Sequence, residues 1–147
     1  MKLVIQRVAQ AKVSAQNHQE EIQKGLFILL GIGANDIKGT MAKCAEKVFK
    51  MRLMADKDGK MNLTVNNVNG EFLVVSQFTL YADTSGGNRP SFIDAAPPEQ
   101  AKELYLHFVD SLKSLGATVK TGSFGNFMKI NAELDGPVTI IVESPEK

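Results

Sequence analysis

The chain has 147 residues, of which 44% are hydrophobic and 22% charged, and its formal net charge is +1. These values are typical of a soluble globular domain, exclude a global electrostatic pull towards nucleic acid, and predict one domain over residues 1–147. A single cysteine, Cys44, excludes an internal disulfide and fits a reducing, cytoplasmic setting. No apolar run approaches the roughly 18 residues that a membrane span needs.

The first part of the chain predicts strands. Residues 3–15 are rich in Val, Ile and Ala and predict a long strand, and a turn then leads to a short returning strand over residues 20–23. Residues 26–32 form a continuous apolar run, which is typical of a buried strand. The glycines at positions 31 and 33 lack the third glycine of a dinucleotide-binding fingerprint, so we interpret this stretch as a plain turn.

Two segments have a helical period. Residues 37–54 carry an apolar stripe that includes Cys44, which is therefore expected to be a buried hydrophobe rather than a nucleophile. Residues 56–59 lack the spacing of a calcium loop and predict a turn into a strand over residues 61–65. Residues 97–115 predict a second helix, because prolines and Glu99 open it and Gly116 ends it.

Residues 70–81 predict one extended segment around which the chain is organised. Residues 72–75 have no polar alternation, so both faces of this strand should be buried. Ser76, Gln77 and Thr79 follow within the same run. A buried polar group without a partner costs roughly 1–3 kcal/mol, so neighbouring backbone or a ligand must satisfy these side chains.

The last part of the chain returns to strands. A short strand is expected over residues 117–121, and alternation over residues 128–134 predicts a strand with one wet face. Residues 138–142 predict a last strand, and Pro137 makes the Gly136-Pro137 pair a corner, a bulge or an exposed loop. Strands and helices in this order predict an α+β domain on a largely antiparallel sheet.

The usual catalytic constellations are missing from the sequence. There is no His and Cys cluster for zinc, no glycine-rich phosphate loop and no Gly-x-Ser-x-Gly elbow. His18 falls in a turn and His107 off the apolar helical stripe, which argues against a Ser-His or Cys-His pair. We therefore expect neither a metal nor a cofactor.

Several motifs, in a fixed order, carry a resemblance to a known family. They are Ser-Gln-Phe-Thr-Leu at 76–80, Arg-Pro-Ser-Phe at 89–92, Phe-Gly-Asn-Phe-Met at 124–128 and Asp-Gly-Pro-Val-Thr at 135–139. With residues 5–8 and 59–63, they resemble the D-aminoacyl-tRNA deacylase (D-Tyr-tRNA deacylase) family over nearly the whole chain. One position departs from the family pattern Asn-x-Gly-Pro-x-Thr, because Leu134 replaces the Asn whose amide would brace the corner.

The resemblance implies a barrel-like β core with two main helices and a cytoplasmic homodimer. It implies hydrolysis of the ester between a D-amino acid and the 3′-terminal ribose of tRNA, and also of glycyl-tRNA mischarged on tRNA(Ala). The implied partners are tRNA and a second copy of the chain, with no DNA, membrane, metal or cofactor.

The resemblance also implies the site residues. The catalytic segment would be Ser76, Gln77, Phe78 and Thr79, with backbone N–H groups that face an oxyanion. Substrate binding and chiral selection would fall to Gly136, Pro137, Val138, Thr139 and Met128. In the family, Gly-Pro is a cis peptide that reaches into the neighbouring subunit's site. Arg89 would contact RNA phosphate, or is an ordinary surface charge.

Several alternatives remain open at the level of the sequence. Thr79 is a covalent nucleophile, for which the sequence offers no adjacent base, or the substrate's ribose 2′-hydroxyl assists a water. Ser76 and Thr79 are alternatively strand-end hydroxyls bonded to backbone, and Phe78 is a core residue or stacks on an adenine. The whole protein is alternatively an RNA-binding module without catalysis, suggested by Leu134, or a structural dimerisation domain.

Overall fold

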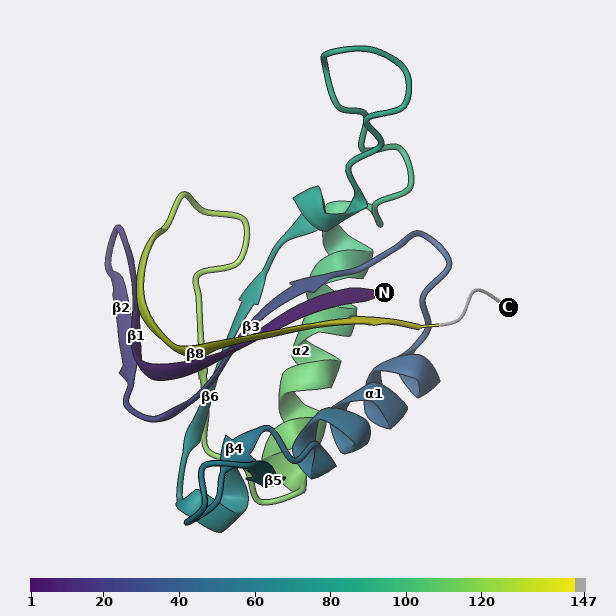
Figure 1. Cartoon of the computed structure of the whole chain (residues 1–147). Coiled ribbons are helices and arrows are strands. Elements are labelled where there is room, and N and C mark those ends of the chain that lie inside the picture. The colour runs from purple at the N-terminus through teal and green to yellow at the C-terminus, as the bar shows by residue number, and fades with distance from the viewer. Residues whose placement is uncertain (145–147) are drawn as a thin grey trace.

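The computed structural model describes residues 1–144 (Figure 1). The elements are β1 Lys2–Ala15, β2 His18–Ile22, β3 Gly25–Gly31, α1 Lys38–Lys50, β4 Met54–Ala55, β5 Met61–Leu63, η1 Asn66–Val68, β6 Glu71–Ser76, η2 Phe78–Tyr81, α2 Pro98–Ser114, β7 Val119–Thr121 and β8 Lys129–Glu143, where η1 and η2 are 3₁₀ helices. Among the described residues, no helix has both the length and the apolar character to cross a membrane.

Strand β1 is the centre of the sheet. Its first half pairs antiparallel with β3 and its second half with β2, while β8 runs antiparallel along its other edge. Strands β3 and β6 are parallel, as are β6 and β7, because α1 and α2 lie within the crossovers that join them. The sheet is therefore antiparallel around β1 and parallel around β6.

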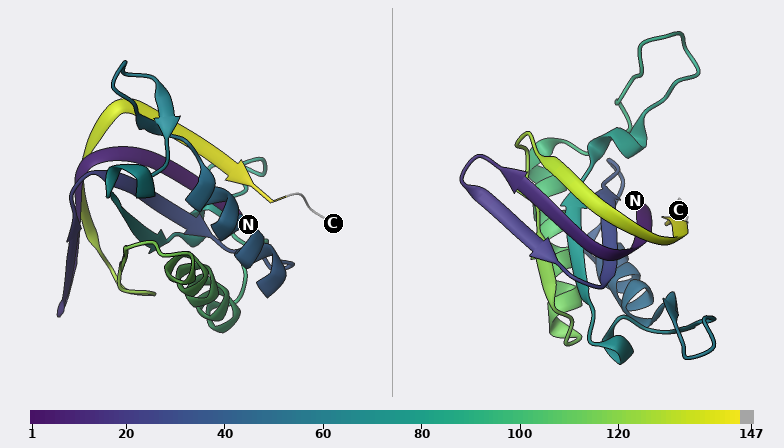
Figure 2. Two further views of the ribbon diagram at one scale, coloured as in Figure 1. Left: turned by 90° about the horizontal axis from the view of Figure 1, so that it is seen from below. Right: turned by 60° about the vertical axis from the view of Figure 1, so that its left-hand side comes forward.

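The curved sheet has a core on each face. The two helices pack against one face, as the two further views in Figure 2 show. Phe72 and Val74 of β6 lie in this larger core, whereas Leu73 and Val75 lie in a smaller cluster on the other face. This confirms the predicted burial of both faces of residues 72–75, and the α+β class with a barrel-like β core is also confirmed.

Three elements differ most from the sequence-based predictions, while the strands predicted over residues 61–65 and 117–121 are each two residues shorter. The strand predicted over residues 70–81 ends at Ser76, because β3 ends beside it and the last ladder bond runs from Gln77 N–H to the Leu30 carbonyl. The helix predicted over residues 37–54 ends at Lys50, because Met54 pairs with Leu63 in the β4–β5 hairpin. The two strands predicted near the C-terminus form the single strand β8, which is bulged at Gly136-Pro137.

Candidate active site

Strand β6 places the Ser-Gln-Phe-Thr motif at its carboxyl end, beside the end of β3. Ser76 is its last residue, and the chain then turns into η2. The Gln77 side-chain amide donates a hydrogen bond to Thr79 Oγ1 at 2.6 Å. Within the described residues, the backbone N–H groups of Phe78 and Thr79 donate to no backbone or side-chain acceptor. Two backbone donors are therefore left for a ligand at this turn.

Two glycines explain how η2 packs against β3. A Cβ at Gly31 would lie 3.0 Å from the Gln77 carbonyl oxygen and from Leu80 Cβ, and a Cβ at Gly33 would lie 2.6 Å from Tyr81 Oη. Such contacts are too close for a real side chain. The sequence predicted a plain turn here, and the structure adds that the glycines allow η2 and the residue before it to approach β3 and the turn that follows it.

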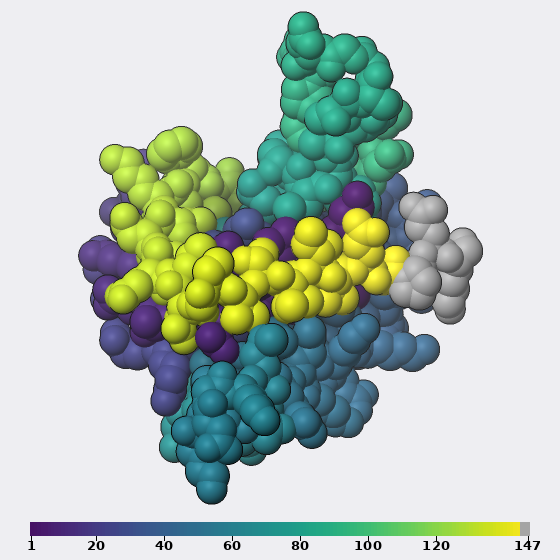
Figure 3. Space-filling view, in the orientation of Figure 1, coloured from purple at the N-terminus to yellow at the C-terminus, as the bar shows by residue number. Residues whose placement is uncertain are grey.

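A hollow of about 400 Å³ opens beside Gln77, at the notch in Figure 3 between the green segment that precedes β8 and the teal segment above it. Its lining residues are Phe27, Leu29, Val75, Gln77, Asn126, Phe127, Met128 and Ile130. Met128 Sδ accepts a hydrogen bond from Ser123 N–H, and Phe127 is 85% exposed. An apolar hollow with few polar groups suits a small organic ligand. A second hollow, of about 580 Å³ over β1, β2 and β8, contains none of the motif residues.

Gly136 and Pro137 lie away from this hollow in the same chain. Their peptide bond is cis, and Gly136 has a φ of 129°. Residues 135–138 stand opposite one residue of β1, Arg7, so the corner bulges out of the ladder. The corner lies three strands from β6 and level with its start, which places it on the order of 15–20 Å from Ser76 at ordinary strand dimensions.

Arg7 braces the corner, a role that the sequence analysis missed. Its buried side chain donates from Nε to the Asp135 carbonyl at 3.1 Å, and Nε also lies 3.2 Å from Asp135 Oδ2. Nη1 donates to the Leu53 carbonyl at 3.0 Å. The available signal was a cation at an inward position of an apolar strand, where it must find partners. Because Arg7 braces the corner, the substitution at Leu134 does not leave it unsupported.

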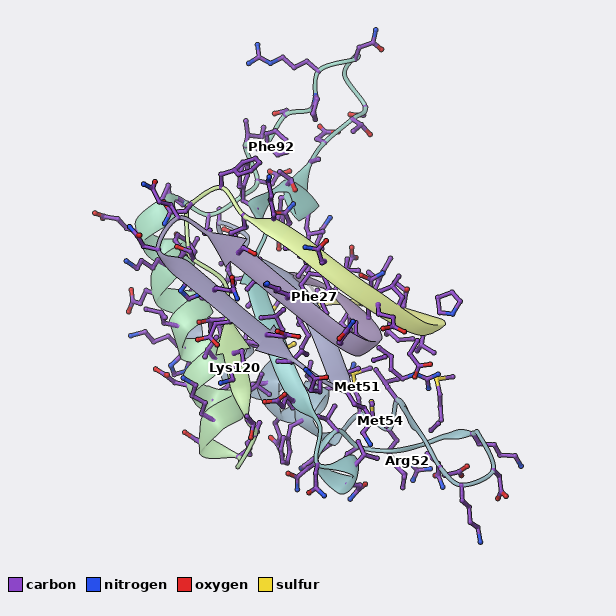
Figure 4. The ribbon with its side chains drawn as sticks, turned by 90° about the vertical axis from the view of Figure 1, so that its left-hand side faces the viewer. Phe27, Met51, Arg52, Met54, Phe92 and Lys120 are labelled. Carbon is purple, nitrogen blue, oxygen red and sulfur yellow. The ribbon has the colours of Figure 1, made fainter. Side chains whose placement is uncertain are left out.

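The remaining predicted residues are spread over the surface. Gln6 Nε2 donates to Thr139 Oγ1 at 3.5 Å, and Val138 lies beside Gly136 in the bulge. Arg89 is exposed in the segment over residues 82–97, which projects from the body in Figure 1. Phe92, labelled at the base of that projection in Figure 4, packs edge-on against Phe78 with the ring centroids 5.1 Å apart.

Phe78 is 54% exposed and lies on a 3₁₀ helix, so it is not a core residue. Among the described residues, the hydrogen-bond partner of the Thr79 hydroxyl is the neutral Gln77 amide, and no acidic, basic or imidazole group is hydrogen-bonded to it. Cys44 is buried, and burial raises the pKa of its thiol to about 11. Within residues 1–144 no group of three His, Cys, Asp or Glu side chains gathers as a metal site. The site therefore consists of backbone donors and neutral polar groups.

The fold is that of a known class of α+β domain. A solved structure of a probable eukaryotic D-amino acid tRNA deacylase matches with a TM-score of 0.85 over 96% of this chain and 97% of that chain, at 13% identity, which shows the fold alone. A c-Myc DNA Unwinding Element Binding Protein matches with a TM-score of 0.91 over 99% of this chain and 100% of that chain, at 37% identity.

Sequence comparison identifies the family. D-aminoacyl-tRNA deacylases of Staphylococcus carnosus (strain TM300) and Thermosipho africanus (strain TCF52B) are 47% and 46% identical over 99% and 98% of this chain and 97% of each relative. The family model of D-Tyr-tRNA(Tyr) deacylase matches residues 4–143. The chain belongs to this family, which confirms the resemblance found in its motifs.

Proposed function

We propose that two copies of this chain together hydrolyse the ester of D-aminoacyl-tRNA and release free tRNA and a D-amino acid. Family membership supports the hydrolase activity. The observation that carries the two-copy site is the separation of Gly136-Pro137 from Ser76 within one chain, on the order of 15–20 Å. At this separation, the corner of a chain does not reach the β6 site of the same chain. The corner of a second copy would therefore complete the site.

Exposed apolar side chains on β8 support this homodimer. Leu134 is 45% exposed and Ile141 is 69% exposed, and Figure 3 shows β8 lying across the surface. In the β1–β8 ladder, Leu134 stands opposite Val8, a member of the smaller cluster that continues into the hollow. Residues directly opposite each other share a face of the sheet. A second copy packed on this face covers the apolar side chains and meets the hollow.

The chemistry requires little beyond positioning, because an aminoacyl ester is already activated. The free N–H groups of Phe78 and Thr79 would stabilise the oxyanion, and the ribose 2′-hydroxyl of the substrate would assist the attacking water. A covalent role for Thr79 needs a base, and the group that contacts its hydroxyl is the neutral Gln77 amide. The 2′-hydroxyl route is therefore our preferred mechanism.

Chiral selection would come from the corner of the second copy. Rigid backbone carbonyls at Gly136 and Pro137 would bind the α-amino group of the substrate and occupy the space of an L side chain. Glycine has no side chain to exclude, so glycyl-tRNA mischarged on tRNA(Ala) would also be a substrate. Val138, Thr139 and Met128 would complete the walls of this shared site.

The nucleic-acid partner in this proposal is an unpaired RNA 3′ end in the cytoplasm, where tRNA is charged. A hollow of about 400 Å³ suits a nucleoside and an amino acid rather than a duplex. One structural relative is named for binding a DNA element. A duplex DNA competitor added to the deacylation assay checks this point, and we expect it to leave the rate unchanged.

Incubation with D-tyrosyl-tRNA and L-tyrosyl-tRNA tests the proposed function. We expect release of tyrosine from the D form alone. No release from the D form, or equal release from both, overturns the proposal. Binding of tRNA with an unchanged ester lifetime would instead indicate an RNA-binding module, and neither binding nor turnover would indicate a structural dimerisation domain.

The variant Thr79→Ala separates the two mechanisms. We expect it to retain activity within about tenfold of the wild type, whereas loss of a true nucleophile costs on the order of 10⁶-fold in kcat in a serine protease. Single-turnover rates on D-tyrosyl-tRNA measure the effect, with thermal unfolding as the control for folding. Complete loss of turnover in a folded variant would establish the covalent route.

A further inference from the structure

A cluster of cations lies on α1 and the β4–β5 hairpin. Residues 43–60 contain six Lys and Arg side chains against three carboxylates, an excess of three in a chain whose net charge is +1. We call the basic hairpin surface the set Lys43, Lys47, Arg52, Lys57 and Lys60, all of which are exposed. Lys43 and Lys47 are four residues apart on the outer side of α1, opposite the buried stripe. The rest of the protein carries, in balance, a small negative charge.

Among the described residues, these five cations are not neutralised by an acidic partner, although Arg52 also donates a hydrogen bond from Nη2 to Asn62 Oδ1 at 2.7 Å. In the part of the chain that the structure describes, none of them forms an ion pair, whereas Arg7, Lys2, Lys38 and Lys120 do. The nearby Asp56 keeps its negative charge but pairs with none of the five cations, since its Oδ1 accepts hydrogen bonds from the backbone N–H groups of Asp58 and Lys60 and so fixes the hairpin turn. The hairpin therefore presents a positively charged surface on a backbone that is fixed by hydrogen bonds.

The position of this surface relates it to the corner. Figure 4 shows Arg52 beside the hairpin, at the opposite end of the molecule from Phe92, which packs against Phe78. Arg7, however, ties the Leu53 carbonyl, one residue before β4, to Asp135 at the corner. The Arg7 guanidinium thus fixes the hairpin relative to the corner. If the corner of one copy lies at the site of a second copy, the basic hairpin surface of the first copy lies near that site too.

We propose that the basic hairpin surface of one copy binds the phosphate backbone of the tRNA whose 3′ end occupies the site of the second copy. This inference rests on the proposed function, in which the corner of one copy lies at the site of the second copy, because the hairpin is fixed to that corner by Arg7. The ligand is chemically a polyanion with regularly spaced phosphates, and Lys and Arg side chains on a fixed loop match it by charge without reading its sequence.

The salt dependence of tRNA binding tests the surface. In the triple variant Lys47→Gln, Lys57→Gln and Lys60→Gln, we expect the slope of log affinity against log salt to become shallower by about 2–3, since each phosphate contact contributes about 0.9. Between 50 and 200 mM salt, the wild type should thus lose about 40-fold more affinity than the variant. At low salt, we also compare kcat/KM on D-tyrosyl-tRNA with kcat/KM on D-tyrosyl-adenosine, which has no phosphate. The ratio of the two values should be lower for the triple variant than for the wild type.

The matched control is the triple variant Lys24→Gln, Lys102→Gln and Lys113→Gln, which removes the same charge from other exposed positions. Its salt slope should equal that of the wild type. Equal slopes for both triple variants would overturn the inference, while D-tyrosyl-tRNA hydrolysis by the wild type would still support the proposed function. Binding without hydrolysis would overturn the proposed function and still test the surface.

Mixed dimers decide whether the surface acts on the partner's site. When one copy carries both Gly136→Ala and the Lys47, Lys57 and Lys60 changes and the other is wild type, the one working site receives an intact corner and an intact hairpin from the wild-type copy. We expect half the activity and the wild-type salt slope. With the two lesions in different copies, the working site receives the altered hairpin, and the slope becomes shallow. The reverse pattern would show that the hairpin serves its own chain's site and would overturn the inference.

Discussion

At the scale of single residues, Arg7 joins two distant segments of the chain through one side chain. Its planar guanidinium presents several donors in a fixed geometry and bonds carbonyls that lie 46 and 128 residues away in the sequence. A lysine at this position has a single nitrogen and cannot hold Leu53 and Asp135 together in the same geometry. The corner therefore depends on the shape of this cation as much as on its charge.

The variant Arg7→Lys tests this dependence. We expect the D-deacylation rate to fall about 10–100-fold and selectivity against the L form to weaken. The free energy of unfolding should fall by roughly 1–3 kcal/mol, because a buried carbonyl loses its hydrogen-bond donor. Parallel rates on D- and L-tyrosyl-tRNA and urea denaturation measure these effects. Arg89→Lys, at an exposed position, should change the free energy of unfolding by less than about 0.5 kcal/mol. Unaltered selectivity in Arg7→Lys would contradict the bracing role.

Gly136 is the residue of the corner that tolerates least change. It has a φ of 129°, and a Cβ there would lie 3.0 Å from Val138 N. In Gly136→Ala we expect loss of most D-deacylation in a protein that still folds. Gly116→Ala is the control, since Gly116 also has a positive φ but a Cβ there meets nothing within 4 Å. Both should lose about 1 kcal/mol of stability, and only the first should lose activity.

Residue identity alone predicted some of these roles. The position of Cys44 on an apolar stripe was enough to predict a buried, unreactive thiol, and its raised pKa agrees. The exposure of Phe78 was not predictable, because an aromatic among Val and Leu reads as core until the strand is seen to end at Ser76. The role of Arg7 depends on contacts with two distant segments, which no local pattern encodes.

At the scale of elements, the parallel pairing of β3 and β6 begins at Gly25. A Cβ at this position would lie 1.8 Å from the Glu71 carbonyl oxygen, which is backbone and cannot move aside without separating the strands. The glycine is therefore part of the pairing and not only a break after the preceding turn.

We expect Gly25→Ala to destabilise the protein by about 3 kcal/mol or more, because overpacking against backbone leaves no side chain to relax. Gly39→Ala is the matched control, since a Cβ at Gly39 meets nothing within 4 Å and the residue lies in α1. It should stabilise the protein by about 0.5–1 kcal/mol. Urea denaturation of both variants measures the difference, and a near-neutral Gly25→Ala would show that the two strands separate easily.

Element types were predictable where the hydrophobic period is strong, and their ends were less so. The continuous apolar run of β3 and the stripe of α2 gave bounds within two residues of those observed. The end of β6 was missed because Phe78, Leu80 and Tyr81 continue a β-forming composition without a glycine or proline. Strand β6 ends at Ser76 because the neighbouring strand β3 ends beside it, and this depends on the pairing in the sheet rather than on the sequence of the segment.

At the scale of the whole molecule, the apolar face of β8 predicts association. Leu134→Lys places a charge on this face, and we expect it to produce monomers and a deacylation rate that rises steeply with protein concentration. Leu106→Lys is the matched control, because Leu106 on α2 is also 45% exposed. Sedimentation equilibrium of both variants reports their mass. An unchanged mass for Leu134→Lys would place the dimer contact elsewhere.

The halves of the candidate site were visible in the sequence, but their separation was not. The Ser-Gln-Phe-Thr segment and the Gly-Pro pair were recognisable as motifs, and the polar groups at the end of β6 indicated a site. The distance between them follows from sheet order, with β1 and β3 between β8 and β6. Sheet order depends on long-range pairing, which a local hydrophobic pattern does not specify.

Under the proposed function, the pairing of β1 with β8 also links the synthesis of β8 to chiral selection. Among the described elements, β1 leaves the ribosome first and β8 last, so one edge of the 14-residue β1 is unpaired until β8 has been synthesised. An open edge of this length favours aggregation. Under the proposed function, an unfinished chain would carry the Ser-Gln-Phe-Thr segment without the corner that we propose rejects L-amino acids. Because it also lacks the strand that pairs with this edge of β1, such a chain would be prone to aggregate as well as unselective.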